Sequence, residues 1–270
     1  MKKTLLIAAL LLTIVGAKAQ TNIQEMYDYQ RGQFTTTLEM FKTDNFGSTF
    51  FFTDIYHKLG ITTPTDFYTE IARAINFWQS SKLGALSLHV EWNGGCGIFN
   101  MGESGWGGYP VNNAWLFGAE YFLHNESFTN TFTFELMYKR ITGQTDNIPV
   151  QFTFVWGMQN LFGVRGLSFS GFIDVWGENN TWVTKEAVEA TYDDAGAELT
   201  PAVPATTEET KLVILSEPQI WYNVGQHFGC EHLMVGGEVE LAYNFTGGCK
   251  GTPGNKGFTW APALGIKWAF

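Results

Sequence analysis

Residues 131–139 read TFTFELMYK, and this stretch decides the fold class. From Phe132 to Tyr138 every second residue is apolar, while Thr133 and Glu135 between them are polar. A period of two places successive side chains on opposite faces of a β-strand, whereas a helix repeats every 3.6 residues. The stretch therefore predicts a strand with one apolar face and one polar face.

The same alternation recurs along the chain after Gln20, separated by clusters of Gly, Asn and Asp. These segments predict an all-β protein of antiparallel strands. We place twelve strands at residues 21–30, 33–42, 48–57, 66–78, 84–92, 112–124, 129–140, 148–156, 166–178, 209–223, 232–245 and 257–270. An even number is what a closed single-chain barrel requires, because closure pairs the first strand with the last.

Alternating strands of this length fit either a soluble β-sandwich or a transmembrane β-barrel. Three features favour the barrel: aromatics near strand ends, Glu and Gln on the polar faces, and a final aromatic, Phe270. Aromatic girdles mark the two membrane interfaces of such barrels. The expected girdle residues are Tyr56, Trp78, Trp92, Tyr138, Trp156, Trp176 and Trp268.

The connections between the predicted strands are long on one side and short on the other. The long ones are 93–111, 179–208 and 246–256, and the short ones are 43–47 and 125–128. Long external loops and short periplasmic turns are the expected asymmetry. Residues 179–210 are acidic and rich in Ala, Thr and Pro, so we expect a mobile external loop, with an interdomain linker as the alternative.

The N-terminus has the three parts of a secretory signal. Lys2 and Lys3 precede the apolar run 5–15, and the small residues Ala17 and Ala19 precede Gln20. We expect a signal peptide at 1–19, cleavage after Ala19, and a barrel domain at 20–270 in the outer membrane of a Gram-negative bacterium. No later stretch approaches the roughly 18 apolar residues of a spanning helix.

The charge balance excludes one class of partner. The chain has 26 acidic and 16 basic residues, a formal net charge of −10. Binding to a nucleic-acid backbone requires basic surfaces, so no nucleic-acid partner is expected. Membrane lipids and a small solute remain as the expected partners of a monomeric barrel.

Strand parity predicts which side chains face the lumen. If Thr49, Phe51 and Ile55 face lipid, the residues between them face inward, and the opposite register would place Asp54 in the membrane at a cost of several kcal/mol. The candidate lumen and substrate-binding residues are Phe50, Phe52, Asp54, Tyr56, Tyr68, Glu70, Arg73, His89, Glu91, Glu135, Asp174 and Glu217. Further inward candidates are Glu39, Glu120, Lys139, Gln151, Glu238, Glu240 and Lys267. For any single carboxylate, filling of the lumen is the alternative to solute binding.

Two assignments need separate reasoning. Arg73 shares parity with Ile71 and Ile75, so either a β-bulge turns it inward toward Glu70 or it lies at the membrane interface; we favour the bulge. Cys96 and Cys249 lie in predicted external loops, where a disulfide could form in an oxidising compartment. The sequence alone does not decide this pairing.

The chain carries no motif of an enzyme or a cofactor site. It lacks a Gly-x-Ser-x-Gly elbow, a His-Glu-x-x-His helix and a phosphate-binding glycine loop, and the glycine-rich residues 93–108 predict a flexible loop. The spacing in 227–232, with two His, one Cys and one Glu, matches no zinc pattern. We expect no enzyme activity, cofactor or metal, although Ser87 and His89 share a face, so a barrel lipid hydrolase stays a minor alternative.

Several segments resemble the Tsx-like nucleoside channels, and most of all an uncharacterised branch related to them. The likeness covers most of the mature chain, in order, at 34–41, 44–54, 67–73, 169–176, 216–222 and 266–270. The resemblance implies a twelve-stranded monomeric outer-membrane barrel with a narrow lumen for small neutral solutes such as nucleosides. The second half and the loops depart from the best-known members.

The function expected from the residues is passive diffusion of small solutes, with nucleosides or similar neutral molecules first. Phe50, Phe52, Tyr56 and Tyr68 would stack on a base, and carboxylates would accept hydrogen bonds from ribose hydroxyls. Because the lumen is rich in carboxylates, neutral or cationic solutes should pass more readily than anions. A closed barrel with a surface or structural role is the principal alternative.

Overall fold

The chain folds into one antiparallel sheet that closes on itself. The computed structural model describes residues 20–145, 147–245 and 256–270. The predicted signal peptide lies outside these residues. The strands are β1 (Gln20–Asp28), β2 (Gln33–Asp44), β3 (Gly47–His57), β4 (Asp66–Ile75), β5 (Leu86–Asn100), β6 (Trp106–His124), β7 (Asn130–Ile141), β8 (Val150–Gln159), β9 (Leu167–Lys185), β10 (Thr191–Tyr192), β11 (Glu198–Thr200), β12 (Thr206–Ser216), β13 (Gln219–Tyr222), β14 (Leu233–Tyr243) and β15 (Phe258–Ala269).

Each barrel strand pairs with its neighbours in sequence, and β1 pairs with β15 to close the sheet. The sheet contains 13 strand segments, of which β12 and β13 both pair with β9 and β14. These two segments are therefore one interrupted barrel strand, and the barrel has twelve strands. The predicted all-β closed barrel and its strand number are confirmed, and every predicted range overlaps an observed strand.

The interruption between β12 and β13 falls at Glu217 and Pro218. Proline has no N–H to donate to a neighbouring strand. The ladder nevertheless continues, since the Glu217 N–H donates to the Phe172 carbonyl (3.2 Å) and the Pro218 carbonyl accepts from Val239 (3.1 Å). Gly171 faces the break with φ of +156°, and a Cβ there would lie 2.5 Å from the Glu217 carbonyl oxygen. Glycine is needed at this close approach.

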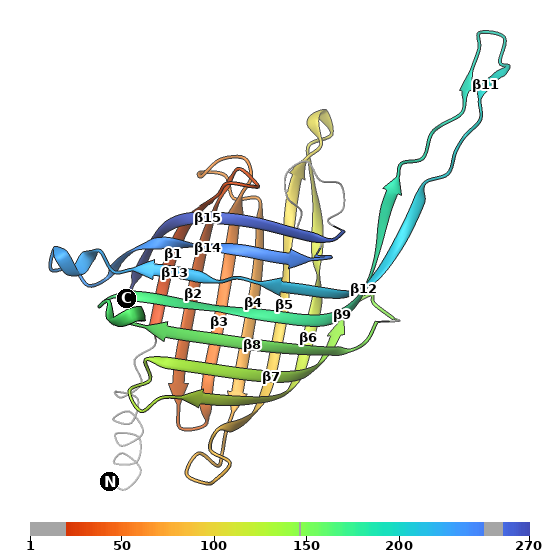
Figure 1. Cartoon of the computed structure of the whole chain (residues 1–270). Coiled ribbons are helices and arrows are strands. Elements are labelled where there is room, and N and C mark those ends of the chain that lie inside the picture. The colour runs from red at the N-terminus through yellow and green to blue at the C-terminus, as the bar shows by residue number, and fades with distance from the viewer. Residues whose placement is uncertain (1–19, 146, 246–255) are drawn as a thin grey trace, which may run out of the picture.

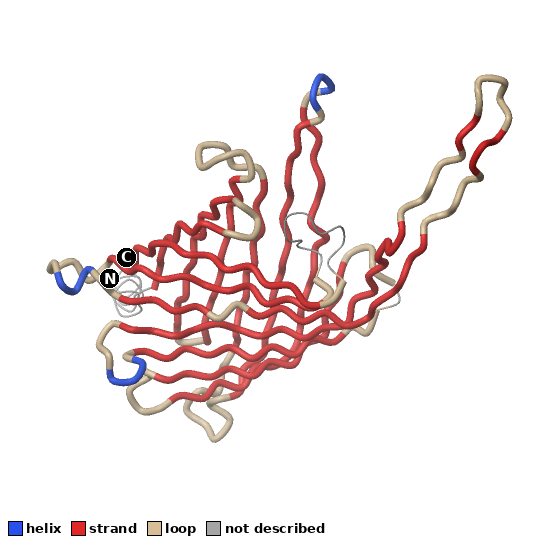
Figure 2. The backbone as a smooth tube through the Cα atoms, turned by 45° about the horizontal axis from the view of Figure 1, so that its top comes forward, coloured by secondary structure: helices blue, strands red, loops and turns tan. Residues whose placement is uncertain are grey.

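Two hairpins project from the side of the barrel where long connections were predicted (Figures 1 and 2). β5 and β6 stay paired as far as Asn100 and Trp106, joined through a 3₁₀ turn at Gly102–Ser104. The expectation of a flexible loop at 93–108 is therefore wrong: glycines allow the ladder to continue through one irregularity near Gly95. Residues 179–210 likewise extend β9 and β12 and add the pair β10 and β11.

The connections on the opposite side include the short turns predicted at 43–47 and 125–128. β2 and β3 are separated by only two residues, and β6 and β7 by five. The third predicted long connection, 246–256, lies almost wholly outside the described residues. Two further 3₁₀ turns occur at Leu161–Gly163 and Gly225–His227. No helix in the described part of the chain is long and apolar enough to cross a membrane.

The two faces of the sheet differ as the alternation predicts. On β7, Leu136 is 62% exposed on the outer face, while Glu135 and Lys139 next to it are buried inside. A surface with an apolar outer face and polar side chains inside inverts the arrangement of a soluble protein. It is the arrangement of a barrel surrounded by lipid.

The barrel is not evenly round, and parts of its interior are packed. Figure 1 shows the wall of β8, β9, β13, β14 and β15 running across the wall of β1 to β4. Two apolar clusters fill the interior between walls. The larger contains Ala114, Leu116, Met137, Ile141, Trp176 and Val213, and the smaller contains Met26, Trp221 and Ala263. Trp176 thus lies inside the barrel, and so does Tyr56, so the assignment of these two residues to the aromatic girdle is wrong.

Candidate functional site: the barrel lumen

An aromatic ladder lines the inner face of β3 and β4. The ring centroids of Phe50 and Phe52 are 6.0 Å apart, and those of Phe52 and Tyr68 are 6.1 Å apart. The strands place them together because Phe52 pairs with Glu70 and Asp54 pairs with Tyr68. Residues directly opposite on neighbouring strands share one face of the sheet. The ladder therefore presents apolar ring surface beside carboxylates.

The carboxylates next to this ladder already accept hydrogen bonds from hydroxyl groups. The Thr37 hydroxyl donates to Asp54 Oδ1 (2.5 Å), and the Tyr56 hydroxyl donates to Oδ2 at 3.4 Å. The Tyr68 hydroxyl donates to Glu70 Oε1 (2.7 Å). An ionised carboxylate can accept about four hydrogen bonds, so each retains acceptor capacity toward the lumen.

A small acidic cavity lies inside the barrel, toward the end of the same wall that carries the long connections, which we call the outer end. It is lined by Asp54, Tyr56, Glu217, Glu238, Glu240 and Arg31, among others. Arg31 comes from the turn between β1 and β2, and its guanidinium is held by Asp28 (3.0 Å) and by Glu240. Strand periodicity gives no signal for a turn residue, so sequence reasoning missed Arg31 at this position. Its charge offsets part of the acidic lining.

A second polar cluster lies on β5, β6 and β7. His89 Nδ1 is 2.9 Å from Glu120 Oε2 and 4.0 Å from Glu135 Oε2, while His89 Nε2 is 3.0 Å from Glu91 Oε2. Both ring nitrogens therefore face carboxylates rather than the hydroxyl of Ser87. The nucleophile and base pair considered for a lipid hydrolase is not formed at this place.

The remaining inner cations lie over aromatic rings. Lys139 Nζ is 4.0 Å from the ring centroid of Trp176 and donates to Gln151 Oε1 (2.7 Å). Lys267 Nζ lies 4.3 Å from the ring centroid of Trp221. A cation over an aromatic face is attracted by the ring quadrupole. On β8 and β9, the Thr153 hydroxyl donates to Asp174 Oδ1 (2.5 Å).

Carboxylates outnumber cationic side chains on the described inner surface. The strand register places on it the carboxylates of Glu39, Asp54, Glu70, Glu91, Glu120, Glu135, Asp174, Glu217, Glu238 and Glu240. The cationic or titratable bases facing them are Arg31, His89, Lys139 and Lys267. Charges in a confined lumen are poorly screened, so the field disfavours anions.

A family model matches nearly the whole described chain. The model for a domain of unknown function, DUF5020, matches residues 21–270. The chain belongs to this family. No curated protein sequence matches the chain. The Tsx-like resemblance stays a prediction.

Seventeen chains of solved structures match the fold. One of them is the NanC porin in a rhombohedral crystal form, with a TM-score of 0.50 and 8% sequence identity. The match covers 92% of the present chain and 98% of the NanC chain. At this identity the likeness shows that the two chains share a fold, and it does not show that they share a function.

Eleven of the twelve candidate lumen residues of this DUF5020 member lie on the inner face, and Arg73 does not. No bulge interrupts the pairing of β3 and β4, so Arg73 stays in register opposite Thr49. Its guanidinium donates to Thr49 Oγ1 (2.9 Å) and to Asp44 Oδ1 (2.8 Å), near the β2–β3 turn. The favoured prediction that a bulge turns Arg73 toward Glu70 is therefore wrong. Asp44, at the end of β2, holds the Arg73 side chain near this turn.

At the outer end, a short network joins two strands. Lys58 Nζ is 2.8 Å from Asp66 Oδ2 and 3.0 Å from the Tyr109 hydroxyl, which itself donates to Asp66. Burial lowers the pKa of Lys58, but the hydrogen bonds to Asp66 and Tyr109 outweigh burial and raise the pKa above its ordinary value. The network ties the base of the β5–β6 hairpin to the β3–β4 connection.

The cysteine and histidine candidates outside the lumen have separate outcomes. Cys96 is exposed on β5, and Cys249 lies outside the described residues, so their disulfide stays a prediction. In the segment 227–232, His227 Nε2 is 2.7 Å from the Tyr222 hydroxyl, and Glu231 pairs with Arg165 at 2.8 Å. These side chains point to different partners rather than to one common centre.

Proposed function

We propose that this protein is an outer-membrane channel for passive diffusion of small solutes, with nucleoside-like neutral molecules as the first substrate class. The observation that carries the proposal is the inner face of β3 and β4, where an aromatic ladder stands beside carboxylates. The apolar outer face of a closed barrel supports the membrane location. The porin title of a protein with the same fold agrees with a channel.

The chemistry of a nucleoside matches this wall in two ways. A nucleobase has a flat face that stacks on Phe or Tyr, at about 1 to 3 kcal/mol per base. Ribose hydroxyls need acceptors, and Asp54 and Glu70 retain acceptor capacity beside the rings. A sugar lacks the flat face, and a nucleotide adds negative charge to an acidic lumen. Uncharged and cationic solutes with a planar ring are the expected substrates.

Swelling of liposomes that contain the purified barrel tests the proposal. We expect uridine or adenosine to enter faster than a sugar of similar size, and a nucleotide to enter slowest. Heat-modifiable migration on a gel verifies that the barrel is folded in each preparation. Equal rates for nucleoside and sugar would exclude the selective aromatic wall, and no entry of any solute would exclude the open channel.

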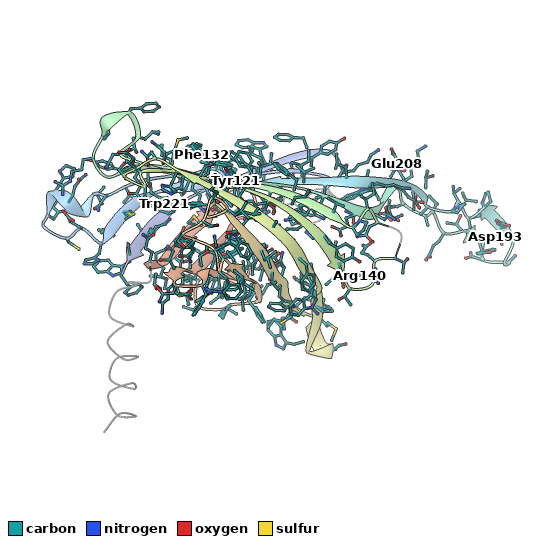
Figure 3. The ribbon with its side chains drawn as sticks, turned by 90° about the horizontal axis from the view of Figure 1, so that it is seen from below. Tyr121, Phe132, Arg140, Asp193, Glu208 and Trp221 are labelled. Atoms are coloured by element: carbon teal, nitrogen blue, oxygen red, sulfur yellow. The ribbon has the colours of Figure 1, made fainter. Side chains whose placement is uncertain are left out.

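The projecting hairpin favours a second candidate, a role at the cell surface. Figure 3 shows Asp193 and Glu208 along this hairpin, far from the barrel residues Trp221 and Phe132. The extended arm is exposed and acidic and contributes no described side chain to the lumen. If no solute enters the liposomes, deletion of 188–203 and measurement of cell-surface adhesion would test this second role.

A further inference from the structure

The cluster around His89 has the composition and spacing of a metal site. His89 Nδ1 and one carboxylate oxygen each from Glu120 and Glu135 lie within 4.8 Å of one another. Two ligands about 2.1 Å from one tetrahedral ion lie roughly 3.4 Å apart. The distances from Nδ1 to the two carboxylates, 2.9 and 4.0 Å, bracket that spacing. An ion between the three atoms would need only small side-chain shifts.

The strand register brings like charges together here. Glu120 on β6 pairs directly with Glu135 on β7, and both point into the barrel. Like charges directly opposite on neighbouring strands are destabilising, and more so where water is scarce. The side chains are mostly shielded, with exposures of 13% for Glu120 and 9% for Glu135. A cation between them would remove this repulsion, and Glu91 adds a third carboxylate that one histidine cannot balance.

The second ring nitrogen of His89 provides a further indication of a metal site. His89 Nε2 is 3.0 Å from Glu91 Oε2, so Glu91 holds the ring from the side opposite to Glu120 and Glu135. In metal sites, a ligating histidine almost always donates its second ring N–H to a carboxylate, carbonyl or water, which orients the ring. His89 and Glu91 have this relation, with Nδ1 directed at the two other carboxylates.

We propose that His89, Glu120 and Glu135 bind one divalent transition-metal ion of the Zn²⁺ class in the lumen wall, with Glu91 as a positioning residue. One imidazole nitrogen and two carboxylate oxygens are accepted ligands of Zn²⁺. Three protein ligands leave one position for water, which the lumen can supply. The site is separate from the aromatic ladder on β3 and β4, so it does not depend on the proposed solute.

Calorimetric titration of Zn²⁺ into the untagged full-length barrel in detergent, with the cysteines alkylated, tests the site. We expect one equivalent to bind. Glu135→Gln and Glu120→Gln should each weaken this binding at least about tenfold, because each removes a charged ligand. Glu91→Gln should keep the one-to-one stoichiometry and weaken binding about 10- to 100-fold, the usual effect of losing an orienting partner.

Glu39→Gln is the matched control, because Glu39 is also a lumen carboxylate but lies on β2 and accepts from Asn22 (2.8 Å). It should bind Zn²⁺ like the unchanged protein. Heat-modifiable migration shows whether each variant is folded, and if Glu135→Gln fails to fold, Glu120→Gln and Glu91→Gln still decide. Absence of a one-equivalent site, or equal affinity in Glu120→Gln and Glu39→Gln, would overturn the proposal.

The absorption spectrum of Co²⁺ added in place of Zn²⁺ reports the ligand atoms in the same samples. We expect visible d–d bands without a thiolate charge-transfer band, and we expect these bands to be lost in Glu120→Gln but kept in Glu39→Gln. Bands that persist in Glu120→Gln would place the metal elsewhere, for example among the histidines of 227–232, and would contradict the assignment.

Discussion

The two halves of the inner surface follow the same alternation of inward and outward side chains, but their inward side chains differ in chemistry. On β6, β7, β9 and β12 the inward positions near the outer end hold Leu116, Met137, Trp176 and Val213, which pack against one another. On β1 to β4 they hold aromatic rings, hydroxyls and carboxylates around a cavity. One half therefore supplies packing, and the other lines a cavity. Parity decides which side chains face inward, but their chemistry decides whether they fill the lumen or line it.

The largest effect is expected from the packed half. Leu116 is fully buried, so Leu116→Ala should destabilise the barrel by about 2 to 5 kcal/mol through lost contacts and a cavity. Denaturant unfolding in detergent measures it. Leu136→Ala, on the lipid-facing side of β7, is the control and should cost less, because lipid or detergent replaces the lost contacts. Equal losses would contradict the division into packed and open halves.

The next effect concerns the aromatic wall. Phe50→Ala combined with Phe52→Ala should lower nucleoside entry at low concentration several-fold, since stacking contributes about 1 to 3 kcal/mol per base. Liposome swelling measures entry, and heat-modifiable migration should be unchanged. Phe134→Ala with Phe152→Ala, on the outer face, controls for the loss of two aromatic rings. Unchanged entry in the inner-face variant would remove Phe50 and Phe52 from the solute path.

A smaller change is expected from the cation in the acidic cavity. Arg31→Gln removes the charge that Asp28 and Glu240 hold, so the outer end becomes more negative and cation preference should rise a few-fold. The reversal potential of a planar bilayer under a salt gradient measures this preference. Arg165→Gln is the matched control, because Arg165 pairs with Glu231 on an exposed connection. A shift toward anions would contradict the role of Arg31.

The smallest effect is expected at Arg73, outside both halves. Arg73→Ala breaks a partly exposed pair with Asp44, and such pairs contribute about 0 to 1 kcal/mol. Unfolding should shift by no more than that, and nucleoside entry should stay as in the unchanged protein. A large loss of transport would mean that Arg73 acts on the lumen after all, as the bulge would have required.

Much of the fold was predictable because alternate residues of a strand face opposite sides of the sheet, so their polarity indicates the environment on each side. The stretch 131–139 shows the principle: Phe134, Leu136 and Tyr138 face outward, and Glu135 and Lys139 face the interior. Once the face was known, the inner positions of Phe50, Asp54 and Glu217 followed. The alternation did not predict the structure of the segments in which it is interrupted. Residues 93–108 are glycine-rich, which indicates flexibility locally, yet backbone pairing with β6 holds them in a hairpin.

Side-chain partners were the part that parity could not supply. Trp176 shares the inward face of Asp174, two residues before it, so strand alternation already opposed its girdle assignment; what alternation does not give is that Trp176 joins Leu116 and Val213 in one cluster. Arg31 lies at a turn, where period two gives no direction, and its carboxylate partners hold it over the cavity. Arg73 keeps the face that it shares with Ile71, and alternation could not show that Asp44 pairs with it there.

The sequence by itself determined that this is a twelve-stranded closed barrel with an apolar outside and a carboxylate-rich inside, because alternation is local and is set by burial on one face. Only the tertiary structure decided which inner side chains meet. The pairing of Glu120 with Glu135 beside His89, and the entry of Arg31 into the acidic cavity, depend on the register between strands and on the shape of the closed sheet. Neither is encoded in any single strand.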